Sequence, residues 1–193
     1  MYELQAILDR VMNGELPSTD ESMVLADVQN AALLLPAAAA LRDRGFNNVV
    51  TYSKKVFIPL THLCRDVCHY CTFAQAPKKV AAPYLSLEQV LRTTTQAAEM
   101  GCKEALFTLG EKPELRYKAA RDALAEMGYT STTDYLHDVA AAVFEKTGLL
   151  PHLNPGTLDV DELTRLRGVS PSMGIMLEST AERLTQKGMP HYG

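Results

Sequence analysis

Short apolar runs alternate with helix-like stretches from residue 48 onward, and this alternation most strongly limits what the chain can fold into. The first strand region, 49–52 and 56–60, is too apolar on both faces for a sheet that is wetted on one side. Strands that alternate with helices predict βαβ units and a parallel sheet with right-handed crossovers. Three further strands are predicted, over 105–109, 149–153 and 174–177.

The helix ends in this part of the chain carry local signals. Ser86 and Gln89 form a capping box, which predicts a helix that ends at Gly101. Asn154-Pro155-Gly156 predicts a turn directly after the third strand. The other helices are predicted over 115–127, over 136–144 and from Asp159 to Gly168.

Residues 1–47 show helical periodicity but no residue pattern that points to chemistry. Helices are predicted over 2–13, from a capping box at Ser18 and Glu21, and from Pro36 to Gly45. We therefore expect two parts, a helical segment over 1–47 and an α/β domain over 48–193.

The α/β part is short for a closed barrel. A complete (β/α)8 barrel takes roughly 250 residues, and the roughly 145 residues after the helical segment supply about half of that. We therefore expect a truncated chain whose α/β fold is part of a (β/α) barrel, with about four βα units. The alternative is a complete chain that dimerises through the sheet face left uncovered.

The charge of the chain argues against some classes of partner. With a net charge of −4 and a pI near 5.7, it lacks the broad basic field that a phosphate backbone requires, so no nucleic-acid partner is expected. The longest apolar stretch, 31–41, is interrupted by Pro36, and the N-terminus lacks a secretory signal. We expect no membrane association and a cytoplasmic location, where clustered cysteines are typical of metal binding or catalysis.

Cys64, Cys68 and Cys71 form a C-x3-C-x2-C pattern directly after the first strand, at the end of the sheet where α/β folds place their sites. A [4Fe-4S] cluster held by three thiolates would keep one iron free for a small chelating ligand. Structural zinc normally has four protein ligands in paired short spacings. His62 and His69 are the nearby candidates for a fourth ligand, so a zinc-binding interaction module stays as the alternative.

This cysteine pattern, with an aromatic residue before the third cysteine, resembles the radical S-adenosylmethionine (radical SAM) superfamily. Segments 52–66, 68–73, 101–110 and 149–156 together are similar to the FO synthase family, which makes 7,8-didemethyl-8-hydroxy-5-deazariboflavin (FO), the chromophore of a deazaflavin coenzyme. The similarity runs from about Gly45 to the C-terminus. It is greatest to the subunit, or N-terminal half of a fused two-domain enzyme, that closes the deazaflavin ring.

The resemblance implies that Cys64, Cys68 and Cys71 are the cluster ligands and that S-adenosylmethionine is the cosubstrate. Tyr70 matches the aromatic position whose backbone contacts the adenine. No residue is assigned a catalytic role beyond the cluster ligands.

Two further elements are implied by the resemblance to contact the cosubstrate. Gly110-Glu111 matches the superfamily's Gly-Gly-Glu element, which receives the methionine amine, although Leu109 replaces the first glycine. Glu178, at the end of the fourth predicted strand, matches a polar contact to the ribose. A carboxylate at a strand's carboxyl end can accept charge-assisted hydrogen bonds from an ammonium group.

The activity implied by the resemblance is that of a radical SAM lyase. A 5′-deoxyadenosyl radical would abstract hydrogen from an aminated hydroxybenzyl-ribityl-uracil, and cyclisation, loss of ammonia and re-oxidation would follow. The implied partners are this small-molecule substrate, a second radical SAM subunit or fused domain, and an electron donor. The alternatives are another radical SAM reaction, such as the step that joins tyrosine to the ribityl-uracil, and a fragment that is inactive by itself.

Some of these residues have simpler interpretations. Cys102 lies between a helix end and a strand, as a buried structural thiol would. His152 and Asn154, at the end of the third predicted strand, would face a substrate, whereas the turn that begins at Asn154 explains the asparagine without one. The two interpretations stay open. Glu111 has a second interpretation as a helix-start carboxylate before Pro113.

Overall fold

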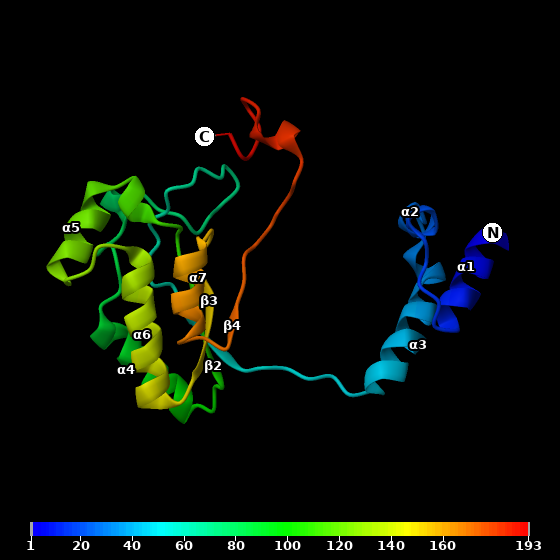
Figure 1. The fold of residues 1–193 in the computed structure, drawn as a ribbon, viewed down its shortest axis with the longest axis horizontal. Coiled ribbons are helices and arrows are strands. Elements are labelled where there is room, and N and C mark those ends of the chain that lie inside the picture. The colour runs from blue at the N-terminus through cyan, green and yellow to red at the C-terminus, as the bar shows by residue number, and fades with distance from the viewer. Residues whose placement is uncertain (1, 193) are drawn as a thin grey trace. The chain divides into compact units, whose positions relative to one another are not determined.

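The computed structural model describes residues 2–192 and divides into two compact units, Met1–Tyr52 and Ser53–Gly193 (Figure 1). The first unit is helical and the second contains all the strands of the described chain. The predicted domains, a helical segment over 1–47 and part of a barrel over 48–193, stay a prediction.

The first unit has the three helices that the sequence predicts, with little core between them. Ile7 is the one buried apolar side chain among the residues described in this unit. The second helix begins at the capping box of Ser18 and Glu21. The elements are α1 (Tyr2–Met12), α2 (Thr19–Ala26), the 3-10 turn η1 (Ala31–Leu33) and α3 (Leu35–Phe46).

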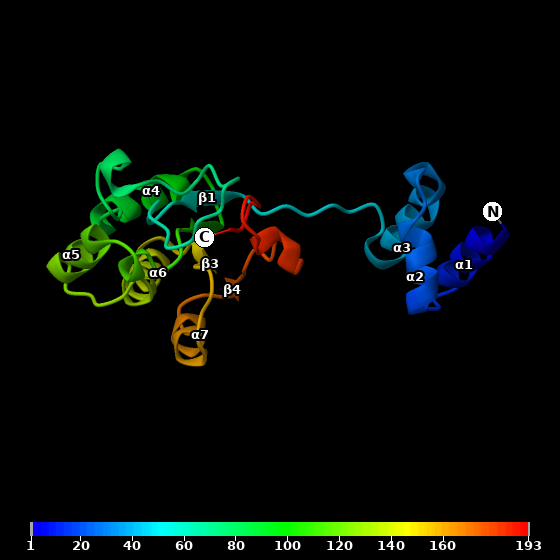
Figure 2. The same ribbon diagram turned by 90° about the horizontal axis from the view of Figure 1, so that it is seen from above.

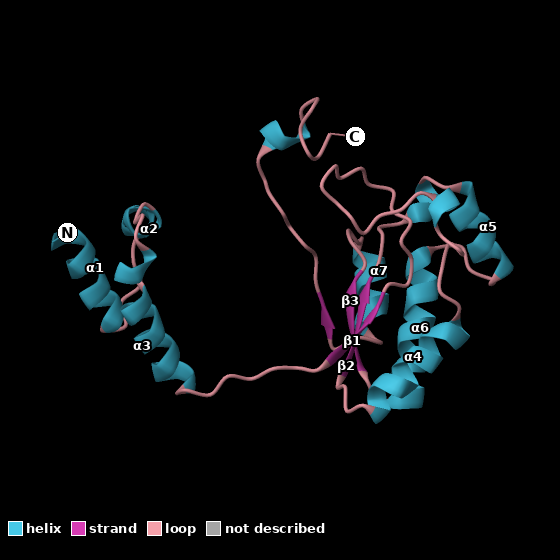
Figure 3. Ribbon diagram, turned by 180° about the vertical axis from the view of Figure 1, so that it is seen from behind, coloured by secondary structure: helices cyan, strands magenta, loops and turns pink. Residues whose placement is uncertain are grey.

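The second unit is built on a four-stranded parallel sheet in the order β1-β2-β3-β4, which confirms the predicted α/β class (Figure 3). Its strands are β1 (Lys55–Ile58), β2 (Glu104–Thr108), β3 (Leu150–Asn154) and β4 (Ser172–Met173). Its helices are α4 (Leu87–Glu99), α5 (Lys118–Glu126), α6 (Thr132–Thr147) and α7 (Val160–Arg167), with short 3-10 turns η2 (Pro77–Lys79), η3 (Pro113–Leu115) and η4 (Glu182–Thr185).

The core lies between one face of this sheet and the helices. Figure 2 shows α4, α5 and α6 gathered on one side of the strands. Ile58, Phe107 and Leu153 occupy matching register positions on this face and are fully buried. On the opposite face Phe57 is 50% exposed. The sheet therefore has one packed face and one open face within the described chain.

Two predicted strand segments are wrong. Residues 49–52 form no strand, and Val50 and Tyr52 are 81% and 88% exposed. The fourth strand is Ser172–Met173 instead of 174–177, and Leu177 is 73% exposed. The run 49–52 has no neighbouring strand within residues 2–192. In the run 174–177 the Gly174 N–H donates to the Leu153 carbonyl of β3 at 3.0 Å, but the later residues form no ladder, and an apolar run becomes a strand only where a ladder partner satisfies its backbone.

Local caps explain where the helices of the second unit begin. Ser86 and Gln89 make both hydrogen bonds of the predicted capping box. Ser131 caps α6, which therefore begins at Thr132, earlier than predicted. Asp159 caps α7 as expected. No helix among the described residues is both long and apolar enough to cross a membrane.

Candidate functional site

The cysteine loop leaves β1 and crosses closely over the chain that leaves β2. The N–H of Gly110 donates to the carbonyl of Thr61 at 3.0 Å. A Cβ atom at Gly110 would lie 1.8 Å from the carbonyl oxygen of Leu63. A side chain at this position is therefore excluded by backbone atoms, and glycine lets the two segments approach.

The three thiols lie at this carboxyl end of the sheet. Cys64 and Cys68 are partly buried, while Cys71 is exposed. Cys64 Sγ accepts a hydrogen bond from the Glu111 N–H at 3.3 Å, and Cys71 Sγ accepts one from the Ala74 N–H at 3.5 Å. Cys64 is thus tied to the end of β2, whereas the Cys71 contact stays within its own loop.

The pKa values of Cys64 and Cys68 are both raised above their ordinary value. Partial burial raises the pKa of Cys68, and the negative charges of Asp66, Cys64 and Cys71 raise it further. Burial also raises the pKa of Cys64. A metal centre bound to these sulfurs would reverse this effect by stabilising the thiolates.

The candidate metal ligands of the loop are its three thiols and the two nearby histidines. Among residues 2–192, no three His, Cys, Asp or Glu side chains converge on one point that would hold a metal ion. His62 Nδ1 is 3.1 Å from the Phe73 carbonyl oxygen and His69 Nε2 is 2.9 Å from that of Tyr192. A zinc-bound histidine makes the same kind of contact with its second ring nitrogen, so both histidines stay as candidate zinc ligands. Because the irons of a [4Fe-4S] cluster occupy separate corners, its three thiolates need not converge.

Glu111 lies beside Cys64; the residue is 8% exposed and its carboxylate is already paired. Oε1 accepts hydrogen bonds from Arg65 Nε at 2.9 Å, from Arg65 Nη2 and from the Thr157 hydroxyl. Oε2 accepts one from the Thr157 N–H at 3.2 Å. Burial acts to raise the pKa of Glu111, but the hydrogen bonds from Thr157 and Arg65 outweigh it and hold the pKa below its ordinary value.

The predicted turn at 154–156 contributes to this arrangement. Gly156 has a φ of +85°, and a Cβ atom there would lie 2.5 Å from Glu111 Oε2. The turn therefore presents Thr157 to the carboxylate from β3. The contacts of Arg65 and Thr157 with Glu111 were not predicted, although Arg65 adjoins a cysteine and Thr157 directly follows the turn.

Tyr70 and Glu178 were predicted to contact the cosubstrate. Tyr70 is 50% exposed, and its ring meets that of His191 edge-on with centroids 5.2 Å apart. Glu178 does not end a strand, because β4 stops at Met173, and this predicted position is wrong. Glu178 lies in an exposed irregular stretch, and its negative charge is one of the smaller causes that raise the pKa of Cys68.

His152 and Asn154 lie on the open face of the sheet, next to β4. His152 Nδ1 is 2.7 Å from the Ser172 hydroxyl. With its amide oriented to satisfy its neighbours, Asn154 donates to His152 Nε2 at 3.2 Å and to the Gly174 carbonyl at 3.3 Å. A Cβ atom at Gly174 would lie 2.8 Å from the Asn154 side chain. Both side chains thus have structural partners.

Comparisons with known proteins identify the family to which the chain belongs. Residues 58–192 match the family described as the Radical SAM superfamily. The chain is 48% identical to FO synthase of Mycobacterium leprae over 207 residues, which cover 98% of this chain and 24% of that protein. It is 48% identical to 7,8-didemethyl-8-hydroxy-5-deazariboflavin synthase of Methanopyrus kandleri over 143 residues, 74% of this chain and 43% of that one. The chain thus spans about a quarter of the first relative's length.

Solved structures share the fold at low sequence identity. Methylornithine synthase (PylB) aligns with a TM-score of 0.68 at 21% identity, over 97% of this chain and 51% of that one. HydG, a maturase of the [FeFe]-hydrogenase, aligns with a TM-score of 0.69 at 19% identity, over 93% and 38%. Both proteins are longer than the present chain, so the likeness concerns part of their fold.

Proposed function

Because the chain belongs to the radical SAM superfamily, we propose that it is the cluster-binding part of an enzyme of FO synthesis. Members of the superfamily use a [4Fe-4S] cluster and S-adenosylmethionine. The observation that carries the proposal is the C-x3-C-x2-C loop at the carboxyl end of β1, in a chain 48% identical to an FO synthase. Residues 48–193 would form the N-terminal portion of the barrel domain, with the helical segment 1–47 before it.

In this proposal Cys64, Cys68 and Cys71 bind the cluster as thiolates. When bound, the cluster supplies the electron that cleaves S-adenosylmethionine to methionine and a 5′-deoxyadenosyl radical. Gly110 lets the loop approach the chain that leaves β2, so Cys64 is held next to the end of that strand. Catalysis of this kind requires that the reacting groups be held in one orientation and that water be kept from the radical.

The residues around the loop would hold the cosubstrate. A carboxylate offers about four acceptor positions, and Oε2 of Glu111 accepts one hydrogen bond, so it can accept another from the methionine ammonium group. The Tyr70 backbone would contact the adenine, and Glu178 would reach the ribose. These residues bind and orient the cosubstrate and take no part in the chemical step.

The reaction proposed is closure of the deazaflavin ring. The substrate would be an aminated hydroxybenzyl-ribityl-uracil, which loses a hydrogen atom to the 5′-deoxyadenosyl radical, cyclises and releases ammonia. Re-oxidation would then remove one electron, which passes to a one-electron acceptor, and one proton, which passes to solvent. Support comes from the relative in Methanopyrus kandleri, whose name gives the deazaflavin product. The tyrosine-joining half of the synthesis would belong to a second radical SAM subunit or a fused domain, and an electron donor would reduce the cluster.

A product assay tests this function. The protein is reconstituted anaerobically with iron and sulfide, reduced, and given S-adenosylmethionine with the aminated intermediate. We expect a fluorescent deazaflavin. Product formation from tyrosine and the ribityl-uracil instead would assign the other step, and about one zinc per chain without acid-labile sulfide would identify a structural zinc module.

A further inference from the structure

Arg65 makes contact with Glu111 through both its backbone and its side chain. Its N–H donates to the Glu111 carbonyl at 2.9 Å. Its guanidinium donates to Glu111 Oε1 from Nε at 2.9 Å and also from Nη2, and Nη2 lies 3.3 Å from the Thr157 hydroxyl. Arg65 therefore joins the cysteine loop to the segments that follow β2 and β3.

These contacts close a ring that contains the first cysteine. Arg65 follows Cys64 in the chain, and the Glu111 N–H donates to Cys64 Sγ at 3.3 Å. The position of the sulfur thus depends on where the Glu111 peptide lies, and that in turn depends on Arg65. A second arginine supports the same turn, since Arg116 Nη1 donates to the Arg65 carbonyl at 3.0 Å.

The charges explain why this ring holds its shape. The side chain of Glu111 is 10% exposed and that of Arg65 is 37% exposed. A second carboxylate near the guanidinium is that of Asp66, whose Oδ1 is 3.9 Å from Arg65 Nε. A buried carboxylate that loses its cationic partner is strongly destabilised, so Glu111 keeps Arg65 in place.

We propose that Arg65 is a positioning residue of the cluster site: through Glu111, its guanidinium fixes the location of the Cys64 sulfur. This inference rests on the proposed function of the loop, and it deepens that function by adding a residue which binds neither cluster nor cosubstrate. The planar guanidinium suits this role, because two of its nitrogens, Nε and Nη2, both donate to Glu111 Oε1, whereas an ammonium group has a single nitrogen.

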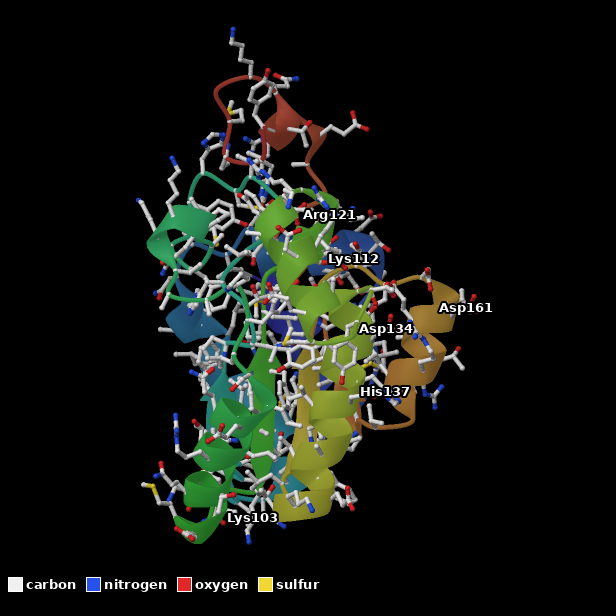
Figure 4. The ribbon with its side chains drawn as sticks, turned by 90° about the vertical axis from the view of Figure 1, so that its left-hand side faces the viewer. Lys103, Lys112, Arg121, Asp134, His137 and Asp161 are labelled. Atoms are coloured by element: carbon white, nitrogen blue, oxygen red, sulfur yellow. The ribbon has the colours of Figure 1, made fainter. Side chains whose placement is uncertain are left out.

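The test compares four variants of the full chain with the wild type. Arg65→Gln removes the charge and the fork, Arg65→Lys keeps the charge alone, and Thr157→Val removes one donor to Glu111. The matched control is Arg121→Gln on α5 (Figure 4). The Arg121 Nη1 donates to the Glu114 backbone carbonyl at 2.7 Å, whereas Arg65 donates to Glu111.

Two properties of the reconstituted proteins are measured. The first is the rate at which iron is lost to a chelator, measured as the decay of the cluster's broad absorption band near the edge of the visible range. The second is the set of g-values of the reduced cluster, which reports ligand geometry. Urea unfolding of the apoproteins runs in parallel, because a role in fold stability alone would lower the urea midpoint and leave the g-values of the folded fraction unchanged.

We expect Arg65→Gln to lose iron about tenfold faster, equivalent to about 1.4 kcal/mol, with altered g-values. Arg65→Lys and Thr157→Val should lie between Arg65→Gln and the wild type, and Arg121→Gln should match the wild type. The proposal is overturned if Arg65→Gln keeps wild-type g-values and rate, or if Arg121→Gln changes them equally.

The outcomes separate this proposal from the proposed reaction. A wild-type chain that holds its cluster but forms no deazaflavin would contradict the reaction, while the Arg65 comparison would still support or overturn the positioning role. A wild-type chain that takes up no cluster would overturn both.

Discussion

Two glutamates bracket β2, and each is paired with a cation and a hydroxyl group. At the amino end, Glu104 accepts hydrogen bonds from Lys55 Nζ at 2.7 Å and from the Ser53 hydroxyl. At the carboxyl end, Glu111 accepts from Arg65 and from the Thr157 hydroxyl. The two ends of one strand therefore carry the same kind of carboxylate contact.

The difference lies in what each pair connects. Lys55 and Glu104 are register partners in β1 and β2, so their ion pair repeats a pairing that the backbone already makes. Glu111 is more buried, and it joins three segments that no sheet ladder holds together. The carboxyl end of a parallel sheet is where barrel enzymes place their sites, while the amino end serves stability. The ion pair of Arg65 and Glu111 therefore ties the cysteine loop to the segments that follow β2 and β3.

The cysteines at the two ends give the largest expected contrast. Cys68→Ala should abolish the iron and acid-labile sulfide of the reconstituted chain, because two thiolates do not hold a cubane. Cys102→Ala, at the amino end of β2, should keep both, since Cys102 packs against the core. Iron and sulfide analysis measures the contrast. Equal metal content in the two variants would remove the distinction between the ends of the strand.

Alanine substitutions at two glycines, one on either side of β2, compare the backbone packing at the two ends of the strand. Gly110→Ala should lower the free energy of unfolding by about 3 kcal/mol, because the new Cβ meets the Leu63 backbone, which cannot move aside. Gly101→Ala, before β2, meets no atom within 4 Å and bears only the strain of its φ of +80°, so we expect about 1 kcal/mol. Urea unfolding of the two variants gives both values. An equally small loss of stability in Gly110→Ala and Gly101→Ala would show that the Leu63 backbone can move away from residue 110.

Neutralising each glutamate sharpens the comparison. Glu111→Gln should lower the free energy of unfolding by about 2 kcal/mol, because it leaves Arg65 with a neutral partner in a largely buried site. Glu104→Gln removes a more exposed ion pair and should change it by less than about 1 kcal/mol. Chemical denaturation at neutral pH distinguishes them, and a larger effect at Glu104 would reverse the assignment of the two ends.

The smallest effect concerns pH. Hydrogen bonds from Lys55 and Ser53 hold the pKa of Glu104 below its ordinary value. The folded state therefore favours the ionised carboxylate, and its stabilisation is complete above the unfolded pKa of about 4.3 and is lost as the pH falls through the folded value. The stability difference between wild type and Glu104→Gln should stay constant from pH 7 to about pH 5 and shrink below that. A difference that grew on acidification would contradict the sign of this linkage.

Much of the second unit could be predicted from local sequence. The capping boxes at Ser86 and Asp159 need only neighbouring residues, and both helices form where they indicate. The predicted strand over 174–177 does not form, because a strand depends on a distant ladder partner that local sequence does not reveal. The cysteine loop was identified by its spacing. Its contacts with Glu111 were missed, because Arg65 meets residues 46 and 92 positions away.

The central claim is that the cysteine loop holds a cluster with one iron open to the cosubstrate. The most direct measurement is the electron paramagnetic resonance spectrum of the reduced, reconstituted chain with and without S-adenosylmethionine. The account predicts a signal whose g-values shift when S-adenosylmethionine is added, because an iron without a protein ligand takes up the chelating amino acid. A signal that is identical in both samples, or no cluster signal at all, would contradict it.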